Sequence, residues 1–253
     1  MFNRIKNRYQ RELADRFARR NAFVGLTQPI VSFTFDDFPR SALYQGGAIL
    51  RDHDMLGTYY ASFGLMRQTA PTGEIFYEED LFEFTQQGHE LGCHTFDHCH
   101  SWDTEPAEFE ASILRNQQKF SSVNYAPEVT SFSYPISCPR PETKHRTSKH
   151  YDTARGGGQT FNIGRTDLNY LKSFFIEQSR DNFSAIQEII DANVRANGWL
   201  IFSTHDVCDG PTRYGCTPDL FKRIVESVAR SGSKVLPVNQ AFALISGKSR
   251  AAL

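Results

Sequence analysis

The chain has 253 residues, which fits one large α/β domain or at most two small ones. Hydrophobic residues make up 40% of it, enough for a sizeable core. The net charge of −1 gives no support for a nucleic-acid-binding protein, which would usually carry a basic excess. No stretch has the length and apolar character needed to span a bilayer, and the N-terminus lacks the apolar run of a secretory signal.

Five cysteines are spread over the chain, an odd number without any CxxC pair of the zinc-knuckle type. They are Cys93, Cys99, Cys138, Cys208 and Cys216. This pattern favours free thiols in a reducing compartment, and together with the missing signal it predicts a cytoplasmic protein. A loop disulfide between Cys208 and Cys216 is the alternative.

Residues 1–22 differ from the rest of the chain, because apolar residues recur there at helical spacing and arginines occupy the other faces. The apolar residues are Phe2, Ile5, Tyr9, Leu13 and Phe17. Such a helix could make a peripheral contact with the anionic inner face of a membrane, or cover one end of the following domain with its arginines in water. The narrow apolar stripe favours the second interpretation. We therefore expect an amphipathic helical arm at 1–22 and a single α/β domain at 23–253.

After the arm, short β-type runs alternate with helical patterns. The β-type runs are Ile30–Phe35, Thr58–Phe63, Glu90–His94, Val129–Tyr134, Tyr151–Arg155, Phe174–Glu177, Trp199–Thr204 and Lys234–Pro237. The helical patterns are Glu79–Gln87, Pro106–Ser121, Phe183–Ala196 and Pro218–Ser231. Gly88, Gly198 and Gly232 each stand between a helical pattern and a strand, as helix C-caps should. The alternation predicts a parallel sheet, open or closed. The triple glycine at 156–158 lacks the Lys-Ser/Thr sequel of a P-loop and is interpreted as a flexible loop.

Two polar clusters follow predicted strands, at the sheet edge where α/β enzymes place their chemistry. In the first, Asp36 and Asp37 are adjacent, so one could bind a metal while the other takes a proton. Two aspartates that cap the next helix would look the same. In the second, His94 and His98 are four residues apart, which puts them on one face if the segment is helical. That is the spacing of two ligands on one metal, with Asp37 as the third, although paired surface histidines are an alternative.

A third cluster ends the apolar run Trp199–Thr204 with His205. A lone histidine is usually structural. This one shares the predicted sheet edge with the other clusters, and its imidazole can exchange protons near neutral pH.

Together the clusters resemble the polysaccharide deacetylase family, which includes the NodB-type enzymes of carbohydrate esterase family 4. The family's first motif, Thr-Phe-Asp-Asp-Gly-Pro, is similar to Thr-Phe-Asp-Asp-Phe-Pro at 34–39. Its second, His-(Ser/Thr)-x-x-His, matches His94–His98, and its last matches the strand that ends at His205. The order and spacing agree from about residue 30 to about residue 240.

The chain departs from the family pattern in several places. Phe38 replaces a glycine, which should narrow or reshape the loop beside the metal. Ser133 stands where the family often has an arginine that orients the catalytic aspartate, and Arg155 or Arg140 could substitute for it. Asp167 is a candidate for the acid that orients His205, with an ordinary loop aspartate as the competing interpretation.

The resemblance implies an irregular (β/α) barrel of seven or eight parallel strands. It also implies metal-dependent hydrolytic removal of an acetyl group from an amino sugar in a polysaccharide, oligosaccharide or glycolipid precursor. Asp37, His94 and His98 would hold one divalent metal, most often zinc with such ligands. Asp36 would act as the base and His205 as the acid, with Arg155 and Asp167 in support. The substrate would meet the turn Tyr134-Pro135-Ile136, which would supply an oxyanion N–H from a residue other than Pro135.

Two other functions are compatible with these residues. Another metal-dependent amide or imide hydrolase could use the same site, because the motifs encode the reaction and not the acyl donor. An inactive carbohydrate-binding homologue would explain the missing third-motif arginine. The presence of every other catalytic residue type argues against it.

Overall fold

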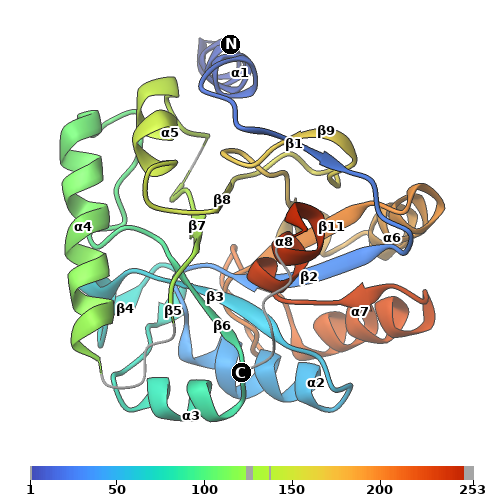
Figure 1. Ribbon diagram of the computed structural model, residues 1–253. Coiled ribbons are helices and arrows are strands. Elements are labelled where there is room, and N and C mark those ends of the chain that lie inside the picture. Colours follow the sequence, from blue (N-terminus) through green and yellow to red (C-terminus); the bar gives the residue numbers. More distant parts are fainter. Residues whose placement is uncertain (1, 124–127, 137, 248–253) are drawn as a thin grey trace.

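The computed structural model describes residues 2–123, 128–136 and 138–247. Its main sheet has eight parallel strands. They are β2 (Ile30–Phe35), β3 (Gly57–Ala61), β6 (Glu90–Cys93), β7 (Ser131–Ser133), β8 (Thr153–Arg155), β10 (Phe174–Phe175), β11 (Trp199–Thr204) and β12 (Lys234–Val235). The hydrogen-bonded order is β10-β11-β2-β3-β6-β7-β8, and β12 pairs with the first residues of β2 (Figure 1).

The sheet curls until its two edge strands approach each other through one connecting segment. Leu171, which precedes β10, forms a parallel bridge with Arg155 at the end of β8, and its carbonyl accepts a hydrogen bond of 3.0 Å from the Gly156 N–H. Three residues further on, the same segment becomes β10 and pairs with β11. The predicted irregular (β/α) barrel is therefore confirmed.

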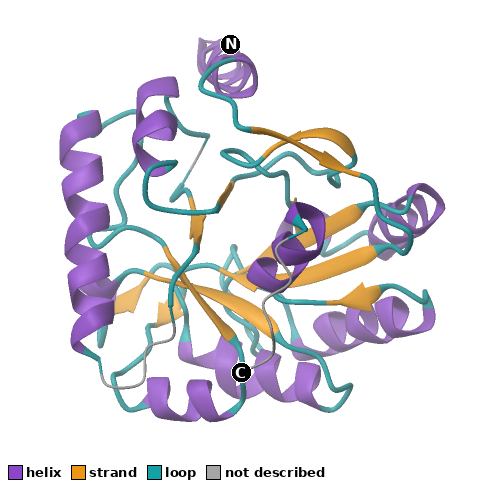
Figure 2. Cartoon of the chain, in the orientation of Figure 1, coloured by secondary structure: helices purple, strands orange, loops and turns teal. Residues whose placement is uncertain are grey.

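Helices cover the outside of the curled sheet (Figure 2). The helices are α1 (Phe2–Arg16), α2 (Ala48–Arg51), α3 (Asp80–Gln86), α4 (Pro106–Ser122), α5 (Pro141–Thr147), α6 (Phe183–Ala196), α7 (Pro218–Arg230) and α8 (Val238–Ser246). The main core lies between this layer and the outward side chains of the strands, such as Phe33, Phe35, Leu91, Phe132 and Phe202. Two short antiparallel pairs complete the fold: β1 (Asn21–Val24) with β9 (Gly164–Asp167), and β4 (Thr69–Ala70) with β5 (Gly73–Glu74).

The inward side chains of the barrel are largely polar, because strand residues alternate between two faces. The Glu90 carboxylate accepts hydrogen bonds from Thr58 (2.7 Å) and Ser131 (2.6 Å). Tyr60 fills the space next to Gly92, where a Cβ would lie 2.4 Å from the tyrosine ring, so no larger residue fits there. The Arg155 guanidinium lies 4.8 Å from the centre of the Tyr60 ring. This polar interior leads toward the carboxyl ends of the strands.

The predicted helices are confirmed, whereas two expectations about glycines need correction. The long helical patterns agree with α3, α4, α6 and α7 to within a residue at each end. The helix α6, however, is capped by left-handed Asn197 (φ 48°) and not by Gly198, whose Cβ position is filled by Phe161. The triple glycine is not a free loop. Its first residue is buried, and the Gly156 carbonyl accepts a hydrogen bond of 2.6 Å from Ser173.

The arm also differs from the expectation. Its helix α1 ends at Arg16, and it contacts the rest of the chain through Gln10 and Ala14, which are buried, while Ile5 and Tyr9 are exposed. The apolar stripe therefore does not cover the end of the domain. The division into an arm at 1–22 and a domain at 23–253 stays a prediction. In the described part of the chain, no helix has the length and apolar character to cross a membrane. All five cysteines are free thiols.

Candidate metal centre and catalytic site

The three polar clusters meet at the carboxyl end of the barrel. Asp36 and Asp37 follow β2, His94 follows β6, and His205 follows β11. In the sheet β2 is the neighbour of β11 and the next neighbour of β6, so parallel pairing places the ends of all three strands at one edge. The Asp36 N–H donates to the Thr204 carbonyl at 3.0 Å, which fixes the start of the first loop against the end of β11.

Asp37, His94 and His98 form a compact set of possible metal ligands. One ligand atom of each lies within 4.8 Å of the others. The Asp37 Oδ1 is 3.1 Å from His98 Nε2 and 3.6 Å from His94 Nε2, yet it is buried without a hydrogen bond of good geometry. A buried carboxylate oxygen without a donor is costly unless a cation completes it. The residues therefore fit a divalent metal with mixed nitrogen and oxygen ligands.

The hydrogen bonds around this set orient it for a metal. The His94 Nδ1 lies 2.8 Å from the Ser133 carbonyl, which can only accept, so Nδ1 carries the proton and Nε2 presents its lone pair toward Asp37. Burial lowers the pKa of His94 to about 4, which keeps the ring neutral as a ligand must be. On the other side, the Thr72 hydroxyl donates to Asp37 Oδ2 at 2.8 Å and fixes the carboxylate.

The contact between His94 and His98 does not come from a helix, as the spacing had suggested. The segment is a turn in which Thr95 (φ 59°) and His98 (φ 53°) are left-handed. Ser112 of α4 accepts hydrogen bonds from the N–H groups of Phe96 and Asp97, which ties the turn to that helix. His98 is the most exposed of the three ligands, with 26% of its side chain accessible, so the set opens to solvent on that side.

Phe38 does not narrow the loop beside the metal ligands. Its backbone is left-handed (φ 54°), a conformation that suits the glycine of the family motif. The side chain turns into the core, where its ring lies 4.9 Å from those of Tyr59 and Phe76 and 5.3 Å from that of Phe84. The aromatic packing offsets the backbone strain. The Phe38 carbonyl also accepts from the Phe76 N–H, which joins the loop to the chain just after β5.

Asp36 is held by Arg155. The guanidinium donates to Asp36 Oδ1 from the end of β8, and both side chains are almost fully buried. Burial by itself would raise the pKa of Asp36, but the positive charge and the hydrogen bond of Arg155 outweigh it, so the pKa is lowered overall. Asp36 is therefore ionised at neutral pH and able to accept a proton. Ser133 stands where the family motif often has an arginine, and Arg155 supplies the cation beside Asp36 instead.

His205 is oriented by the loop that follows it. Its Nδ1 lies 3.1 Å from the Tyr214 carbonyl, so Nδ1 carries the proton and Nε2 is the atom that can exchange one. The loop takes this path because the Asp206 carboxylate accepts hydrogen bonds from the N–H (2.7 Å) and hydroxyl (2.6 Å) of Thr212. His205 directly follows Thr204, whose carbonyl accepts the Asp36 N–H, so it lies at the same strand ends as the two aspartates.

Two predicted supporting residues lie elsewhere. Asp167 accepts from the Arg20 N–H at 2.9 Å and pairs with Lys144 at 2.6 Å, so it fixes the link between α1 and β1 and does not orient His205. A lone aspartate in the sequence carried no signal to distinguish these roles. Arg140 donates to the Trp102 carbonyl at 2.7 Å and is not a partner of Asp36.

The predicted substrate turn Tyr134-Pro135-Ile136 has few backbone N–H groups that could donate to an oxyanion. The Tyr134 N–H already donates to the Arg155 carbonyl at 3.0 Å, and Pro135 has no N–H. Ile136, which is left-handed (φ 69°) and exposed, is therefore the one residue of the turn with an N–H available to an oxyanion.

Sequence reasoning missed Glu177. It lies in the 3-10 turn Ile176–Ser179 directly after β10, at the same end of the barrel. Burial raises its pKa to about 8, the negative charge of Asp36 adds to the effect, and its buried Oε2 has no hydrogen-bond partner. Glu177 is the last residue of the predicted β-type run Phe174–Glu177, and a glutamate at that position gives no indication of a functional role.

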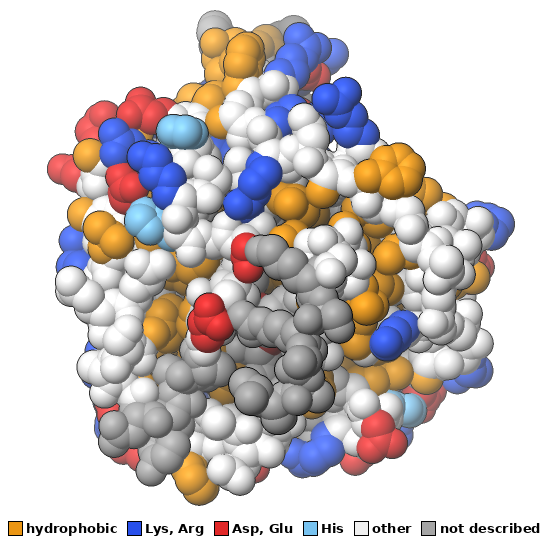
Figure 3. Space-filling view, in the orientation of Figure 1, with side chains coloured by type: hydrophobic (Ala, Val, Ile, Leu, Met, Phe, Trp, Pro, Cys, Tyr) orange, Lys and Arg blue, Asp and Glu red, His pale blue; other side chains and the backbone are white. Residues whose placement is uncertain are grey.

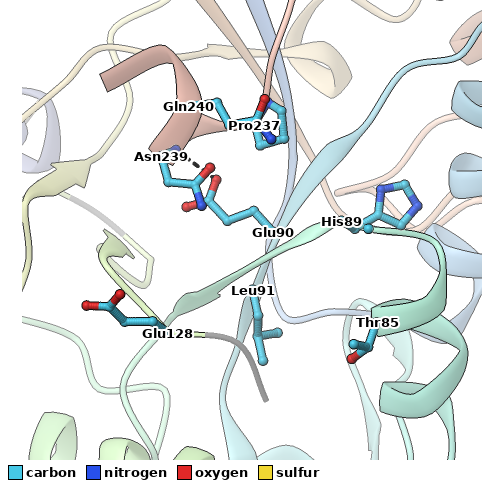
Figure 4. Close-up of a pocket in the computed structure, with 9 residues that line it drawn as sticks. Thr85, His89, Glu90, Leu91, Glu128, Pro237, Asn239 and Gln240 are labelled. Atoms are coloured by element: carbon cyan, nitrogen blue, oxygen red, sulfur yellow. Dashed lines mark hydrogen bonds between the residues drawn. The ribbon is translucent and has the colours of Figure 1, made fainter. Parts of the chain in front are cut away.

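A separate hollow lies at the opposite, amino-terminal end of the strands. Figure 4 shows it beside Glu90, whose carboxylate accepts a hydrogen bond of 3.0 Å from the Asn239 N–H. Both carboxylate oxygens of Glu90 already accept hydrogen bonds, from Thr58, Ser131 and Asn239, so the side chain serves the fold. The hollow is therefore not the catalytic site.

A set of residues that could hold a metal at the carboxyl end of a (β/α) barrel, next to an ionised carboxylate, is typical of hydrolases that activate water. The chain belongs to the polysaccharide deacetylase family, whose model matches residues 24–152. The match includes Asp36, Asp37, His94 and His98 and ends before Arg155.

Solved structures share the fold. The chitin deacetylase of the fungal pathogen Colletotrichum lindemuthianum is similar with a TM-score of 0.60 at 17% identity, over 86% of this chain and 89% of that one. The family 4 carbohydrate esterase PdaA of Bacillus subtilis gives 0.58 at 9% identity, over 96% and 90%. The peptidoglycan deacetylase PdaC of Bacillus subtilis gives 0.57 at 14% identity, over 88% and 93%. No curated protein sequence matches the chain.

Proposed function

We propose that this protein is a metal-dependent hydrolase that removes the acetyl group from an acetylated amino sugar. The observation that carries the proposal is the adjacency of two different carboxylates. Asp37 faces two histidine nitrogens, whereas Asp36 is paired with Arg155 and is free of the metal ligands. Family membership supports the carbohydrate substrate class.

In this proposal each side chain has a separate role. A divalent metal held by Asp37, His94 and His98 would polarise the acyl carbonyl and activate a water molecule. Zinc is our choice, because one carboxylate and two imidazoles are typical of catalytic zinc sites.

Asp36 accepts the proton of the attacking water, and Arg155 keeps its carboxylate from turning toward the metal ligands. The Ile136 N–H stabilises the developing oxyanion. His205 carries a second proton on Nε2 for this step and gives it to the departing amine, and the proton taken up by Asp36 returns to the ring through solvent.

Acetate release from a panel of acetylated substrates tests the reaction. The panel holds nucleotide sugars, chitin oligosaccharides and lipid-linked sugars, each with and without a chelator. We expect activity on at least one, lost with chelator and restored by zinc. Release that survives complete metal removal would overturn the metal-dependent mechanism. Cleavage of a non-sugar amide alone would favour the rival amide hydrolase, and sugar binding without turnover would favour the inactive homologue.

We further propose a cytoplasmic location and a biosynthetic intermediate as substrate. The free cysteines support a reducing compartment. Cell fractionation tests the location, and recovery from a periplasmic or secreted fraction would overturn it.

A further inference from the structure

The N-terminal helix α1 is fixed to the fold by its backbone and by a charged pair. The buried Lys144 ammonium of α5 donates to the carbonyls of Ala14 and Phe17. Lys172 donates to the Asp15 carboxylate. These contacts hold the C-terminal half of the helix in one orientation, so the face it presents to solvent is defined.

That face is apolar. Ile5, Tyr9 and Phe17 are 62%, 61% and 52% exposed. Single exposed hydrophobic residues are common on soluble proteins, but here Ile5 and Tyr9 lie one helical turn apart on α1 and Phe17 follows directly after its last residue. The side of α1 that is buried carries Gln10 and Ala14 instead. The helix therefore presents Ile5 and Tyr9 outward, while Leu13 of the same stripe is half-buried.

The same segment is strongly basic. Residues 1–20 contain seven basic and two acidic residues, a net charge of +5, whereas residues 21–253 carry −6 to give the total of −1. Figure 3 shows hydrophobic and basic side chains side by side at the top of the molecule, where α1 lies. An apolar stripe flanked by arginine and lysine is complementary to an anionic lipid surface.

The helix also lies near the catalytic end of the barrel. Lys144 of α5, the helix that follows Cys138 in the chain, donates to the Ala14 carbonyl. The His100 hydrogen bond lowers the pKa of Asp103, and the charge of Lys6 adds to this effect. Asp103 belongs to the loop that follows the metal ligand His98, and Cys138 to the loop that follows Ile136. Helix α1 is thus beside two loops of the site.

We propose that α1 docks on an anionic lipid bilayer, with Ile5, Tyr9 and Phe17 in the interface and the basic side chains against the headgroups. Docking of this kind would present the site to a substrate anchored in the same leaflet. The membrane contact stands on the helix alone. The lipid-anchored acetylated sugar rests on the proposed function.

Vesicle co-sedimentation of the full chain tests the contact. We expect binding to phosphatidylcholine vesicles that contain phosphatidylglycerol, much weaker binding to phosphatidylcholine alone, and a steep loss in high salt. The variant Ile5→Ser/Tyr9→Ser should bind about tenfold or more weakly, because both side chains lose their apolar contact. Leu114→Ser/Leu244→Ser is the matched control, since these residues are 43% and 53% exposed on α4 and α8.

Equal binding by the two double variants, or no preference for anionic vesicles, would overturn the proposal. Light scattering provides a second check, because a dimer that Ile5→Ser/Tyr9→Ser dissolves would make the stripe a self-association surface instead. The metal-ligand variant His94→Ala should still bind vesicles. Vesicle binding with no deacetylation of any lipid-linked sugar would leave the docking surface standing and remove the substrate assignment.

Discussion

At the scale of single residues, Asp36 and Asp37 are neighbours in the chain with different surroundings. Asp36→Asn should retain the metal and lose roughly 10²–10⁴-fold in turnover, because an amide cannot accept the proton. Metal analysis and acetate release on the same preparation check both halves. A variant with near-normal turnover would show that the base is another residue.

Arg155 is a positioning residue in this scheme. Arg155→Lys should lower kcat roughly 10- to 100-fold while folding and metal content stay unchanged, because a point charge does not reproduce the fork of donors. Arg155→Gln also removes the charge that lowers the pKa of Asp36, so the acidic limb of the pH–rate profile should move to higher pH. Arg140→Lys is the control, and an equal loss there would argue against a specific role for Arg155.

The hairpin β4–β5 acts on the site as an element, because its turn carries Thr72 against Asp37. Thr72→Val should weaken metal affinity about 10–100-fold, as loss of a hydrogen bond to a ligand typically does, and excess metal should restore activity. Thr69→Val, an exposed position on the same hairpin, should change neither. Metal titration separates the two, and an unchanged affinity in Thr72→Val would contradict the role.

The elements that could be predicted are those with a strong internal pattern. Strand β11 and helix α6 coincide with the run Trp199–Thr204 and the pattern Phe183–Ala196. The apolar run and the amphipathic periodicity that predict them depend only on residues close together in the sequence. Helix α8 was missed, and its position depends on distant residues: the Val238 N–H at its start donates to Thr58.

The same distinction holds for the site. Asp37, His94 and His98 were found because the motif spacing is local. Arg155 was found from strand adjacency. Thr72 and Glu177 were missed, because only the tertiary fold brings the turn of the β4–β5 hairpin to Asp37 and the turn after β10 near Asp36.

At the scale of the whole molecule, Glu177 couples stability to pH. Its pKa rises from 4.5 to about 8 on folding, so the folded state holds a proton that the unfolded state releases in this window. Stability should therefore fall as the pH rises from about 4.5 to about 8, and Glu177→Gln should flatten that part of the dependence. Denaturant unfolding at several pH values measures it. The exposed Glu188→Gln serves as control, and an unchanged slope in Glu177→Gln would refute the assignment.

The polar interior of the barrel also bears on how the strands find their register during folding. A slip of β6 by one residue would turn Glu90 toward the outer aromatic layer and bring Leu91 to face Thr58 and Ser131. The carboxyl group would then be buried without donors, and the two hydroxyl groups would lose their acceptor, at a cost of roughly several kcal/mol. Burying these groups adds little to the stability of the native sheet. Their burial instead destabilises each alternative pairing of the strands. The polar side chains that line the barrel therefore select one strand alignment among several that would bury a similar apolar area.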